Sequence, residues 1–308
     1  MARKYRRRRR RYPIAVSLIL MVLVLTYFIL NHFGISIESL LFPDKKPDSK
    51  PLPTGGEIRV HVIDVDQADC ILIETSEGCM LIDSGIDETE VHLKNYLNSC
   101  GITEIDYFLI THPHDDHYGG ADMVLREFEV ENIIYDNYLY PVGILNLFNN
   151  SGANLIDTQL GEKYQLGEAT FTVLCADMAA PRDDKNDYSI VVRLDYGESS
   201  FVFTGDATTF NEKYMLETWG SDMLDCDFLK SPHHGSKTSS SVAYLNALTP
   251  EIVAVSAGVG NSYGLPKQEI LDRYTNVGAD IYRTDLQGDL VFITGGETII
   301  YDKDYWGK

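Results

Sequence analysis

Hydrophobic and polar positions alternate in several short segments of the chain, which is the pattern expected for β-strands. Residues 57–65 alternate in this way and predict a strand with one solvated face. Residues 70–74 and 79–83 predict two further strands, joined by a hairpin turn at Thr75-Ser-Glu-Gly78. Later strands are expected at residues 106–111, 169–174, 189–195, 200–204, 252–256 and 289–294. Helices are expected at residues 90–99, 121–128, 210–219, 242–248 and 267–274, the first of them ending at Cys100-Gly101.

The strands come in hairpin runs with helices interspersed, and they do not alternate strictly with helices. This order favours an α/β architecture in which sheets pack on each other and helices cover the outside. The chain has 308 residues, of which 44% are hydrophobic, so it can bury a large core. We find no internal repeat and expect residues 57–308 to form one domain.

The N-terminal region has the pattern of a membrane anchor. Residues 1–12 carry eight basic side chains and no acidic one, and the apolar segment that follows has only Ser17 and Thr26 as polar residues. A helix over residues 13–35 can span the hydrocarbon core, with its basic flank in the cytoplasm. We therefore expect a single-pass protein of the cell membrane whose C-terminal domain is extracytoplasmic. A cleaved signal peptide is the alternative, although residues 31–37 offer no small-x-small cleavage site.

Composition divides the rest of the chain into a linker and an acidic body. Residues 36–56 are rich in proline and predict an extended linker. The whole chain has a net charge of −20, and without the eight basic residues of its N-terminal segment 18 basic groups face 46 acidic ones, a balance of −28. This charge repels nucleic acid at long range, so a phosphate substrate would have to be held locally by metal. The five scattered cysteines do not indicate a disulfide scaffold.

Candidate metal chemistry is concentrated in one motif, His112-Pro-His114-Asp-Asp116-His117. It directly follows the strand expected at residues 106–111, so three imidazoles and a carboxylate converge on a small volume. These ligand types suit Zn, Mn or Fe. His112 and His114 can face one ion, while Asp116 and His117 turn toward a second. A histidine-rich surface turn is the alternative, but the H-x-H-x-D-H pattern leaves only two positions unspecified.

This motif resembles the signature of the metallo-β-lactamase superfamily, and the resemblance implies a four-layer αββα sandwich preceded here by one transmembrane helix. Asp83 in Leu81-Ile-Asp83-Ser-Gly85 matches an aspartate that orients a metal-binding histidine. Asp206 matches the aspartate that bridges both metals, and Ser231-Pro-His233-His234-Gly-Ser236 matches a late histidine site. The implied ligands of two divalent ions, Zn or Mn, are His112, His114, Asp116, His117, Asp206 and His233.

The resemblance extends to the hydrolase domain of the competence protein ComEC. It runs from about residue 58 to residue 294 and includes His61-Val-Ile-Asp-Val-Asp-Gln-Ala-Asp69, Asn186-Asp-Tyr-Ser189, Asn261-Ser-Tyr-Gly264 and Tyr282-Arg-Thr-Asp285. Asp66 and Ala68 replace two glycines of the relatives, so this loop must have changed shape if those positions need positive φ. Leu265 stands where the relatives have a histidine that could meet the substrate.

A third departure concerns the metal ligands. The histidine that lactamases carry between the H-x-H-x-D-H motif and Asp206 is missing, and Asn186 and Ser189 occupy that region, as they do in the ComEC-like subgroup. One metal site should therefore have fewer protein ligands, which favours Mn or a loosely held ion.

The expected catalytic residues are Asp116 and His234. Asp116 would bind metal and orient the attacking water. Neighbouring histidines on an extended segment point opposite ways, so we expect only one of the two to bind the metal. We prefer His233 as the ligand and His234 as the residue that contacts the substrate or protonates the leaving oxygen, and the reverse assignment is the alternative. The residues expected to support the ligands or meet the substrate are Asp83, Asn186, Ser189 and Ser236, although a turn explains Ser236 equally well.

Taken together, the sequence predicts a membrane-anchored, extracytoplasmic metal-dependent hydrolase acting on a phosphate ester, as a phosphodiesterase or a nuclease with DNA among its candidate substrates. An esterase of wall polymers, such as phosphorylcholine on teichoic acid, is the first alternative. A lactamase is disfavoured by the missing histidine. A degenerate metal-binding or sensor module is the non-enzymatic alternative, and the intact ligand set argues against it. No protein partner is implied.

Overall fold

The computed structural model of the chain describes residues 55–136, 140–176 and 184–306, together with Met21, Lys50 and Pro53. The chain divides into two units, Met1–Asp48 and Ser49–Lys308, and the elements below belong to the second. The predicted cytoplasmic segment, all of the predicted membrane helix except Met21, and nearly all of the linker lie outside the described residues. In the described part of the chain, no helix is both long and apolar enough to span a bilayer.

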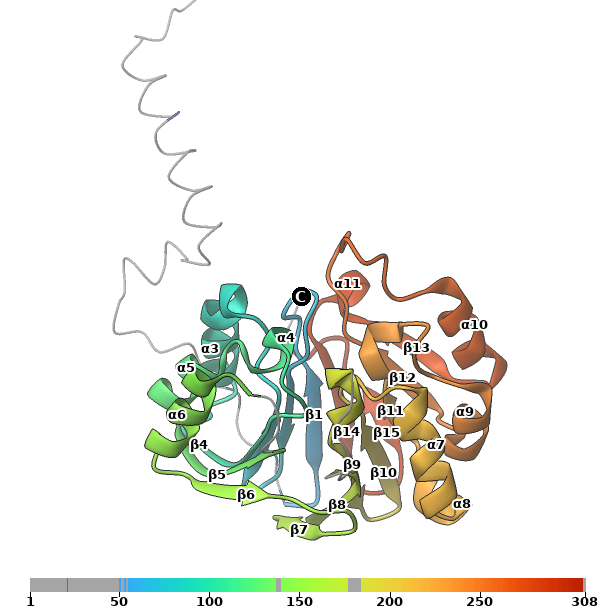
Figure 1. Cartoon of the computed structure of the whole chain (residues 1–308), viewed down its shortest axis with the longest axis horizontal. Coiled ribbons are helices and arrows are strands. Elements are labelled where there is room, and N and C mark those ends of the chain that lie inside the picture. Colours follow the sequence, from blue (N-terminus) through green and yellow to red (C-terminus); the bar gives the residue numbers. More distant parts are fainter. Residues whose placement is uncertain are drawn as a thin grey trace, which may run out of the picture. The chain divides into compact units, whose positions relative to one another are not determined.

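Two β-sheets face each other in the second unit (Figure 1). The first has eight strands in the order β15-β14-β1-β2-β3-β4-β5-β6, and the second has seven in the order β13-β12-β11-β10-β9-β8-β7. The strands of the first sheet are β1 (Ile58–Val62), β2 (Ile71–Glu74), β3 (Cys79–Ile82), β4 (Glu104–Leu109), β5 (Glu129–Tyr135), β6 (Asn154–Asp157), β14 (Leu290–Thr294) and β15 (Ile299–Tyr301). Those of the second are β7 (Lys163–Leu166), β8 (Ala169–Cys175), β9 (Val191–Tyr196), β10 (Ser199–Phe203), β11 (Phe228–Lys230), β12 (Ile252–Val255) and β13 (Asp280–Arg283).

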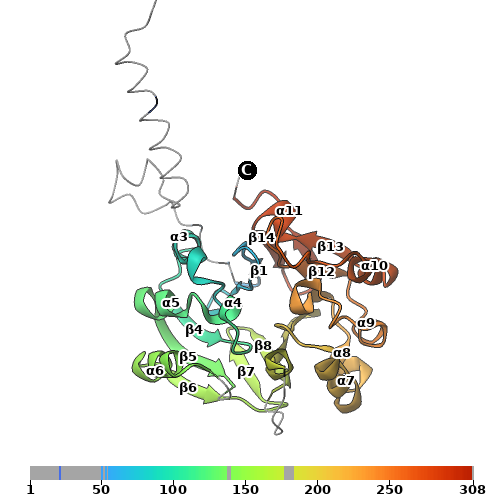
Figure 2. The ribbon, with the colours of Figure 1, turned by 45° about the horizontal axis from the view of Figure 1, so that its top comes forward.

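Helices cover the outer face of each sheet, so the layers run αββα (Figures 1 and 2). The first sheet carries α3 (Glu90–Ser99), α5 (Ala121–Glu127) and α6 (Val142–Asn150), and the second carries α7 (Thr209–Thr218), α9 (Val242–Leu248) and α10 (Gln268–Asn276). The short helices are α4 (Asp115–Tyr118), α8 (Ser221–Leu224) and α11 (Thr284–Gln287), with 3₁₀ turns η1 (Asp87–Thr89), η2 (Lys185–Tyr188) and η3 (Pro232–Gly235). The predicted sandwich of two sheets with helices outside is confirmed.

The first strand shows how the two faces of a sheet are used. Val60 and Val62 of β1 point into the apolar core between the sheets, as the alternation predicted. The opposite face is not solvated, so that part of the prediction is wrong. His61 is fully buried there because α3 and the C-terminal residues cover it, and its Nδ1 lies 2.9 Å from the hydroxyl of Tyr96.

The strands with few buried side chains were not predicted from the sequence. β15, β6, β13 and β7 form the four edges of the two sheets, and none of them was predicted. Most of their residues are exposed or half-buried, so they lack the apolar alternation that marks a strand in sequence. The inner strands β5 and β11 and the helix α6 were also missed, whereas α3 matches its prediction and is followed by Gly101 with φ of 78°.

The carboxyl ends of four inner strands meet at one edge of the sandwich. Asp83 follows β3, the histidine motif follows β4, Asp206 follows β10 and η3 follows β11. β3 runs parallel to β4, and β10 runs parallel to β11. Both sheets therefore deliver their polar loops to the same edge, where the candidate residues lie.

Candidate metal centre

The loop after β4 brings His112 and His114 together. Nε2 of His112 lies 2.9 Å from Nδ1 of His114, and the same Nε2 lies 3.9 Å from Oδ2 of Asp206. The three residues each offer one ligand atom within 4.8 Å of the others. His112 is fully buried and His114 is half-buried, so this group opens toward solvent on one side.

A second group forms around the other oxygen of the same carboxylate. Nε2 of His117 lies 3.5 Å from Oδ1 of Asp206, and Nε2 of His234 lies 3.6 Å from that oxygen. Oδ2 of Asp116 lies 3.6 Å from Nε2 of His234. Asp116, His117, Asp206 and His234 therefore form a compact set of four ligand atoms.

Asp206 lies between the two groups because of the turn that carries it. Gly205 has a φ of 49°, and a Cβ at this position would lie 2.7 Å from the side chain of Thr111 at the end of β4. Only glycine allows this close approach without strain. As a result, Oδ2 of Asp206 faces His112 and Oδ1 faces His117, which is the placement expected of a bridging ligand.

Unpartnered buried atoms test whether these residues fit a metal. Nε2 of His117, Nε2 of His234 and Oδ1 of Asp206 are all buried without a hydrogen-bond partner among the described residues. Buried polar atoms without partners are costly, and native proteins rarely keep several of them in one place. Imidazole nitrogen and carboxylate oxygen are ligands for divalent transition metals. The residues therefore fit a divalent cation here, and the group around His112 offers a second position.

The ligand rings are oriented by Asp83. Nδ1 of His117 donates to Oδ2 of Asp83 over 2.7 Å, which leaves its Nε2 free to face Asp206. Asp83 also accepts from the backbone N–H and the hydroxyl of Thr111, each over 2.8 Å. The Thr111 hydroxyl in turn lies 3.1 Å from Nδ1 of His112. Asp83 thus lies where the sequence placed it, behind a candidate metal ligand. Thr111 was not singled out, and only its place beside the motif could have indicated it.

The adjacent histidines adopt a conformation that the sequence did not predict. His233 and His234 have left-handed backbone angles, with φ of 48° and 51°, and Gly235 continues the turn with φ of 76°. The prediction of an extended segment is therefore wrong, and strand alternation does not separate these two side chains. Non-glycine residues in this region are strained and persist where their surroundings fix them, often at functional sites.

The imidazoles of His233 and His234 differ in how deeply they are buried. His234 is 2% exposed, and its Nδ1 lies 3.1 Å from the carbonyl oxygen of Ser256. A carbonyl oxygen only accepts, so Nδ1 carries the proton of this hydrogen bond. The other ring nitrogen, Nε2, then faces the carboxylates of Asp116 and Asp206. The His233 side chain is 22% exposed, with Nδ1 2.8 Å from the hydroxyl of Thr238 and Nε2 3.5 Å from Oδ2 of Asp206. The geometry therefore favours His234 as the metal ligand and reverses the expected preference for His233.

A buried ion pair lies directly behind His234. Lys230 and Asp69 are both fully buried, and the Lys230 ammonium lies 2.9 Å from the Asp69 carboxylate. Oδ1 of Asp69 lies 3.6 Å from Nδ1 of His234. Lys230 was missed in sequence, although a lysine ending the apolar segment Phe228-Leu-Lys230 is an unusual feature.

The charges of the site shift the pKa values of the imidazoles. Burial disfavours the charged form of His117, but Asp83, Asp206 and Asp116 outweigh it and raise its pKa well above the usual value. Burial is likewise outweighed at His234, whose pKa is raised by Asp206 and Asp69. Burial lowers the pKa of His112 well below its usual value. The surrounding carboxylates therefore favour the protonated form of His117 and His234 next to Asp206 when no metal is bound.

The other predicted site residues, Asn186, Ser189 and Ser236, lie close to the candidate metal centre, and they differ in whether they line its cavity. Asn186 lines the cavity above the ligands, and its Oδ1 has no partner among the described residues. Ser189 is buried with an unpartnered hydroxyl and does not line that cavity. Ser236 also lies outside the cavity lining, and its hydroxyl accepts from Thr238, which contacts His233. Ser236 is thus a support of the turn, in line with the alternative given for it.

The ligands open into a cavity of about 240 Å³. Its lining residues are Gln67, His114, Asp116, Asn186, Asp206, His233, His234, Tyr263 and Leu265. Gln67 comes from the loop after β1 that departs from the relatives. In that loop Asp66 has a positive φ of 62°, a conformation that glycine adopts freely and that aspartate tolerates better than most other residues.

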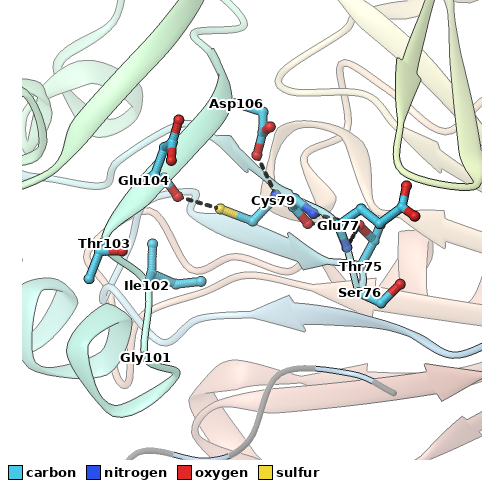
Figure 3. Close-up of a pocket in the computed structure, with 10 residues that line it drawn as sticks. Thr75, Ser76, Glu77, Cys79, Gly101, Ile102, Thr103, Glu104 and Asp106 are labelled. Atoms are coloured by element: carbon cyan, nitrogen blue, oxygen red, sulfur yellow. Dashed lines mark hydrogen bonds between the residues drawn. The ribbon is translucent and has the colours of Figure 1, made fainter. Parts of the chain in front are cut away.

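A larger cavity of about 360 Å³ lies where β3 and β4 begin, at the opposite end of these strands (Figure 3). Its cysteine and the neighbouring aspartate already have partners. The Cys79 thiol donates to the carbonyl oxygen of Glu104, and the Cys79 N–H donates to the Asp106 carboxylate over 2.7 Å. Burial raises the pKa of the Cys79 thiol, so it is not a nucleophile. The chemistry therefore belongs to the smaller cavity.

Comparisons with known proteins agree with this geometry. The sequence model of a protein family, the Metallo-beta-lactamase superfamily, matches residues 63–259 of this chain. The chain is 26% identical over 260 residues to ComE operon protein 3 of Bacillus subtilis (strain 168), covering 77% of this chain and 33% of that protein. It is 29% identical over 273 residues to the competence protein ComA of Neisseria gonorrhoeae, covering 87% of this chain and 37% of that protein. The resemblance to competence proteins is thus confirmed, and the chain spans about a third of the length of these curated relatives.

A solved structure supports the fold. The metallo-beta-lactamase fold protein YhfI from Bacillus subtilis matches with a TM-score of 0.51 at 12% identity, covering 77% of this chain and 99% of that chain. At this identity the likeness shows the shared architecture alone.

Proposed function

Because the chain belongs to the Metallo-beta-lactamase superfamily, we propose that it is a metal-dependent hydrolase of phosphodiesters that acts outside the cytoplasmic membrane. The observation that carries this proposal is the pair of ligand groups that share the carboxylate of Asp206. Two divalent cations, Zn or Mn, would supply an activated water and stabilise charge on the phosphoryl oxygens of an in-line displacement.

The residues divide into three roles in this proposal. His112, His114 and Asp206 would hold one cation, and Asp116, His117, Asp206 and His234 would hold the other. Asp116 would orient the attacking water through its partly exposed carboxylate, and the proton that the water loses would pass to solvent through the open cavity. His233 lines the cavity and donates a proton from Nε2 to the leaving oxygen as the phosphorus–oxygen bond breaks.

The extracytoplasmic location rests on the sequence pattern of residues 1–35. A basic segment before a long apolar one favours a cytoplasmic N-terminus, which sends the domain across the membrane. The strongly acidic composition of the body then faces the cell exterior, where both phosphodiesters and phosphorylcholine-bearing wall polymers are potential substrates.

Metal content and a substrate panel test the proposal. We expect full-length protein, purified in detergent and supplied with Zn²⁺ or Mn²⁺, to bind about two ions per chain and to hydrolyse bis-p-nitrophenyl phosphate. Asp206→Ala should lose both ions and the activity, because it removes the shared carboxylate. Asp122→Asn, an exposed carboxylate on α5, is the matched control and should change neither. Protein that binds two ions but hydrolyses neither phosphodiesters nor phosphorylcholine esters would refute the proposed chemistry.

A further inference from the structure

The cavity above the metal ligands has one apolar section. Tyr263 and Leu265 line it, whereas the rest of the lining consists of the candidate ligands with His233, Gln67 and Asn186. The Tyr263 side chain is accessible, since the residue is 69% exposed, and Leu265 is half-buried. An exposed aromatic ring beside a polar reaction site is a surface on which a flat or apolar group can pack.

The segment that carries these two residues is held in place on both sides. The side chain of Asn261 donates to the carbonyl oxygens of Gly258 and Leu265 and accepts from the Leu265 N–H. The N–H of Lys267 donates to the carbonyl oxygen of Gly235, at the end of the histidine turn. A Cβ on Gly235 would lie 2.6 Å from Cβ of Pro266, so the segment packs directly against that turn. The backbone that carries Tyr263 and Leu265 is therefore held close to the turn of the candidate ligands.

Among residues 55–136, 140–176 and 184–306, no lysine or arginine lines the cavity. On the same segment, the Lys267 ammonium donates to the carbonyl oxygen of Tyr263 over 2.6 Å. Beside the histidine motif, the Lys185 ammonium donates to the carbonyl oxygen of Pro113 over 3.1 Å. Proteins that hold polynucleotides line the path of the backbone with cations, and the acidic balance of this body works against such binding.

We propose that Tyr263 and Leu265 determine the substrate class. They pack against an uncharged aromatic or apolar substituent of a small phosphodiester, whose phosphate meets the metal ligands, and polynucleotides are poor substrates. The cavity of about 240 Å³ is small for a ligand pocket, which fits a single compact substituent. This inference rests on the proposed phosphodiesterase function.

Two substrates with the same leaving group isolate this effect. Bis-p-nitrophenyl phosphate and methyl p-nitrophenyl phosphate both release p-nitrophenolate and differ only in the group that stays on phosphorus. With metal-loaded full-length protein, we expect kcat/KM to favour the aromatic diester by about tenfold, the size of effect that one aromatic stacking contact gives. Tyr263→Ala should remove this preference, and Tyr263→Phe should retain it. Val259→Ala is the matched control, because Val259 is 79% exposed on the same segment and does not line the cavity.

A binding measurement separates substrate selection from catalysis. Diphenyl phosphate should inhibit more tightly than dimethyl phosphate in the original protein and equally in Tyr263→Ala, with metal content unchanged in both. An aromatic preference that survives in Tyr263→Ala would overturn the inference. So would cleavage of a single-stranded oligonucleotide with a higher kcat/KM than the aromatic diester. The protein could also bind both ions, hydrolyse no phosphodiester and still bind the two inhibitors with different affinities. That result would refute the proposed reaction and support the contact between Tyr263 and an aromatic group.

Discussion

At the residue scale, the unusual feature of this site is that its histidines are fixed by backbone geometry as well as by hydrogen bonds. His233 and His234 follow each other in left-handed conformations, so both imidazoles approach Asp206 from one short turn. Only one of them is fully buried. The two histidines are therefore distinguished by how deeply they are buried and not by alternation along the chain, and this difference is the basis of the roles proposed for them.

Alanine variants of the two histidines should therefore fail in different ways. His234→Ala should reduce metal content together with activity, because a buried ligand is lost. His233→Ala should retain the metal and lower turnover of an alkyl ester by roughly 10²- to 10⁴-fold, the usual range for a general acid. The loss should be smaller on a nitrophenyl ester, whose leaving group needs little protonation. Metal analysis and rates for both variants decide the roles, and the assignments would be exchanged if His233→Ala emptied a site while His234→Ala kept it.

The raised pKa values of His117 and His234 predict how metal binding responds to pH. A raised pKa means that each ring of the metal-free protein keeps its added proton to a higher pH than an ordinary histidine does, and a metal must displace that proton. Binding should therefore release about one to two protons and become tighter as pH rises through the pKa values of these rings. Calorimetry of Zn²⁺ binding in buffers of different ionisation enthalpy measures the release. A heat that does not depend on the buffer would contradict the assigned protonation.

At the element scale, the sequence was most informative where an element is buried on one or both faces. The helix α3 and the inner strands β1 to β4 were predicted because their apolar residues recur regularly. The histidine motif was recognised because it concentrates rare ligands at a strand end. The four edge strands were missed because they bury little. The η3 turn was misjudged because left-handed backbone at two histidines is fixed by tertiary contacts that no local pattern shows.

Supporting residues on neighbouring strand ends give the next prediction. Asp83→Ala removes the carboxylate that orients His117, so metal affinity should fall by about 10- to 100-fold, as for other residues that support metal ligands. Asp122→Asn again serves as the exposed control. Competition titrations with a chelating dye measure the affinity. An unchanged affinity in Asp83→Ala would show that the His117 ring is oriented by other contacts.

The buried pair behind His234 predicts a stability effect. Lys230→Met leaves the Asp69 carboxylate buried without its cation, which typically costs about 3–5 kcal/mol of unfolding free energy. The double variant Asp69→Asn/Lys230→Met removes the uncompensated charge and should recover part of that loss. Denaturant unfolding of the three proteins provides the test. If the double variant is no more stable than Lys230→Met, the lost unfolding free energy comes from the packing of the Lys230 side chain and not from its charge.

At the scale of the whole molecule, charge is distributed very unevenly along the chain. The first twelve residues are strongly basic, and the rest carries a balance of −28. A basic N-terminal segment and an acidic domain are the charge pattern expected under the proposed anchored, extracytoplasmic arrangement. The same acidity explains why phosphate binding would depend on metal ligands at one edge of the sandwich and not on a basic surface.

The location of the domain leads to the final prediction. Positively charged flanks of an apolar segment are retained in the cytoplasm, so the residues after the segment over 13–35 should be translocated. A C-terminal alkaline phosphatase fusion should therefore be active in cells, and protease added to intact cells should remove the domain. Replacing the basic residues between Arg3 and Arg11 by glutamine should reduce the fusion activity, because the orienting charge is gone, while replacing acidic residues of the domain should not. A domain that is protected in intact cells and degraded only after lysis would place the hydrolase in the cytoplasm. A mature chain beginning after Asn31 would identify the segment as a cleaved signal.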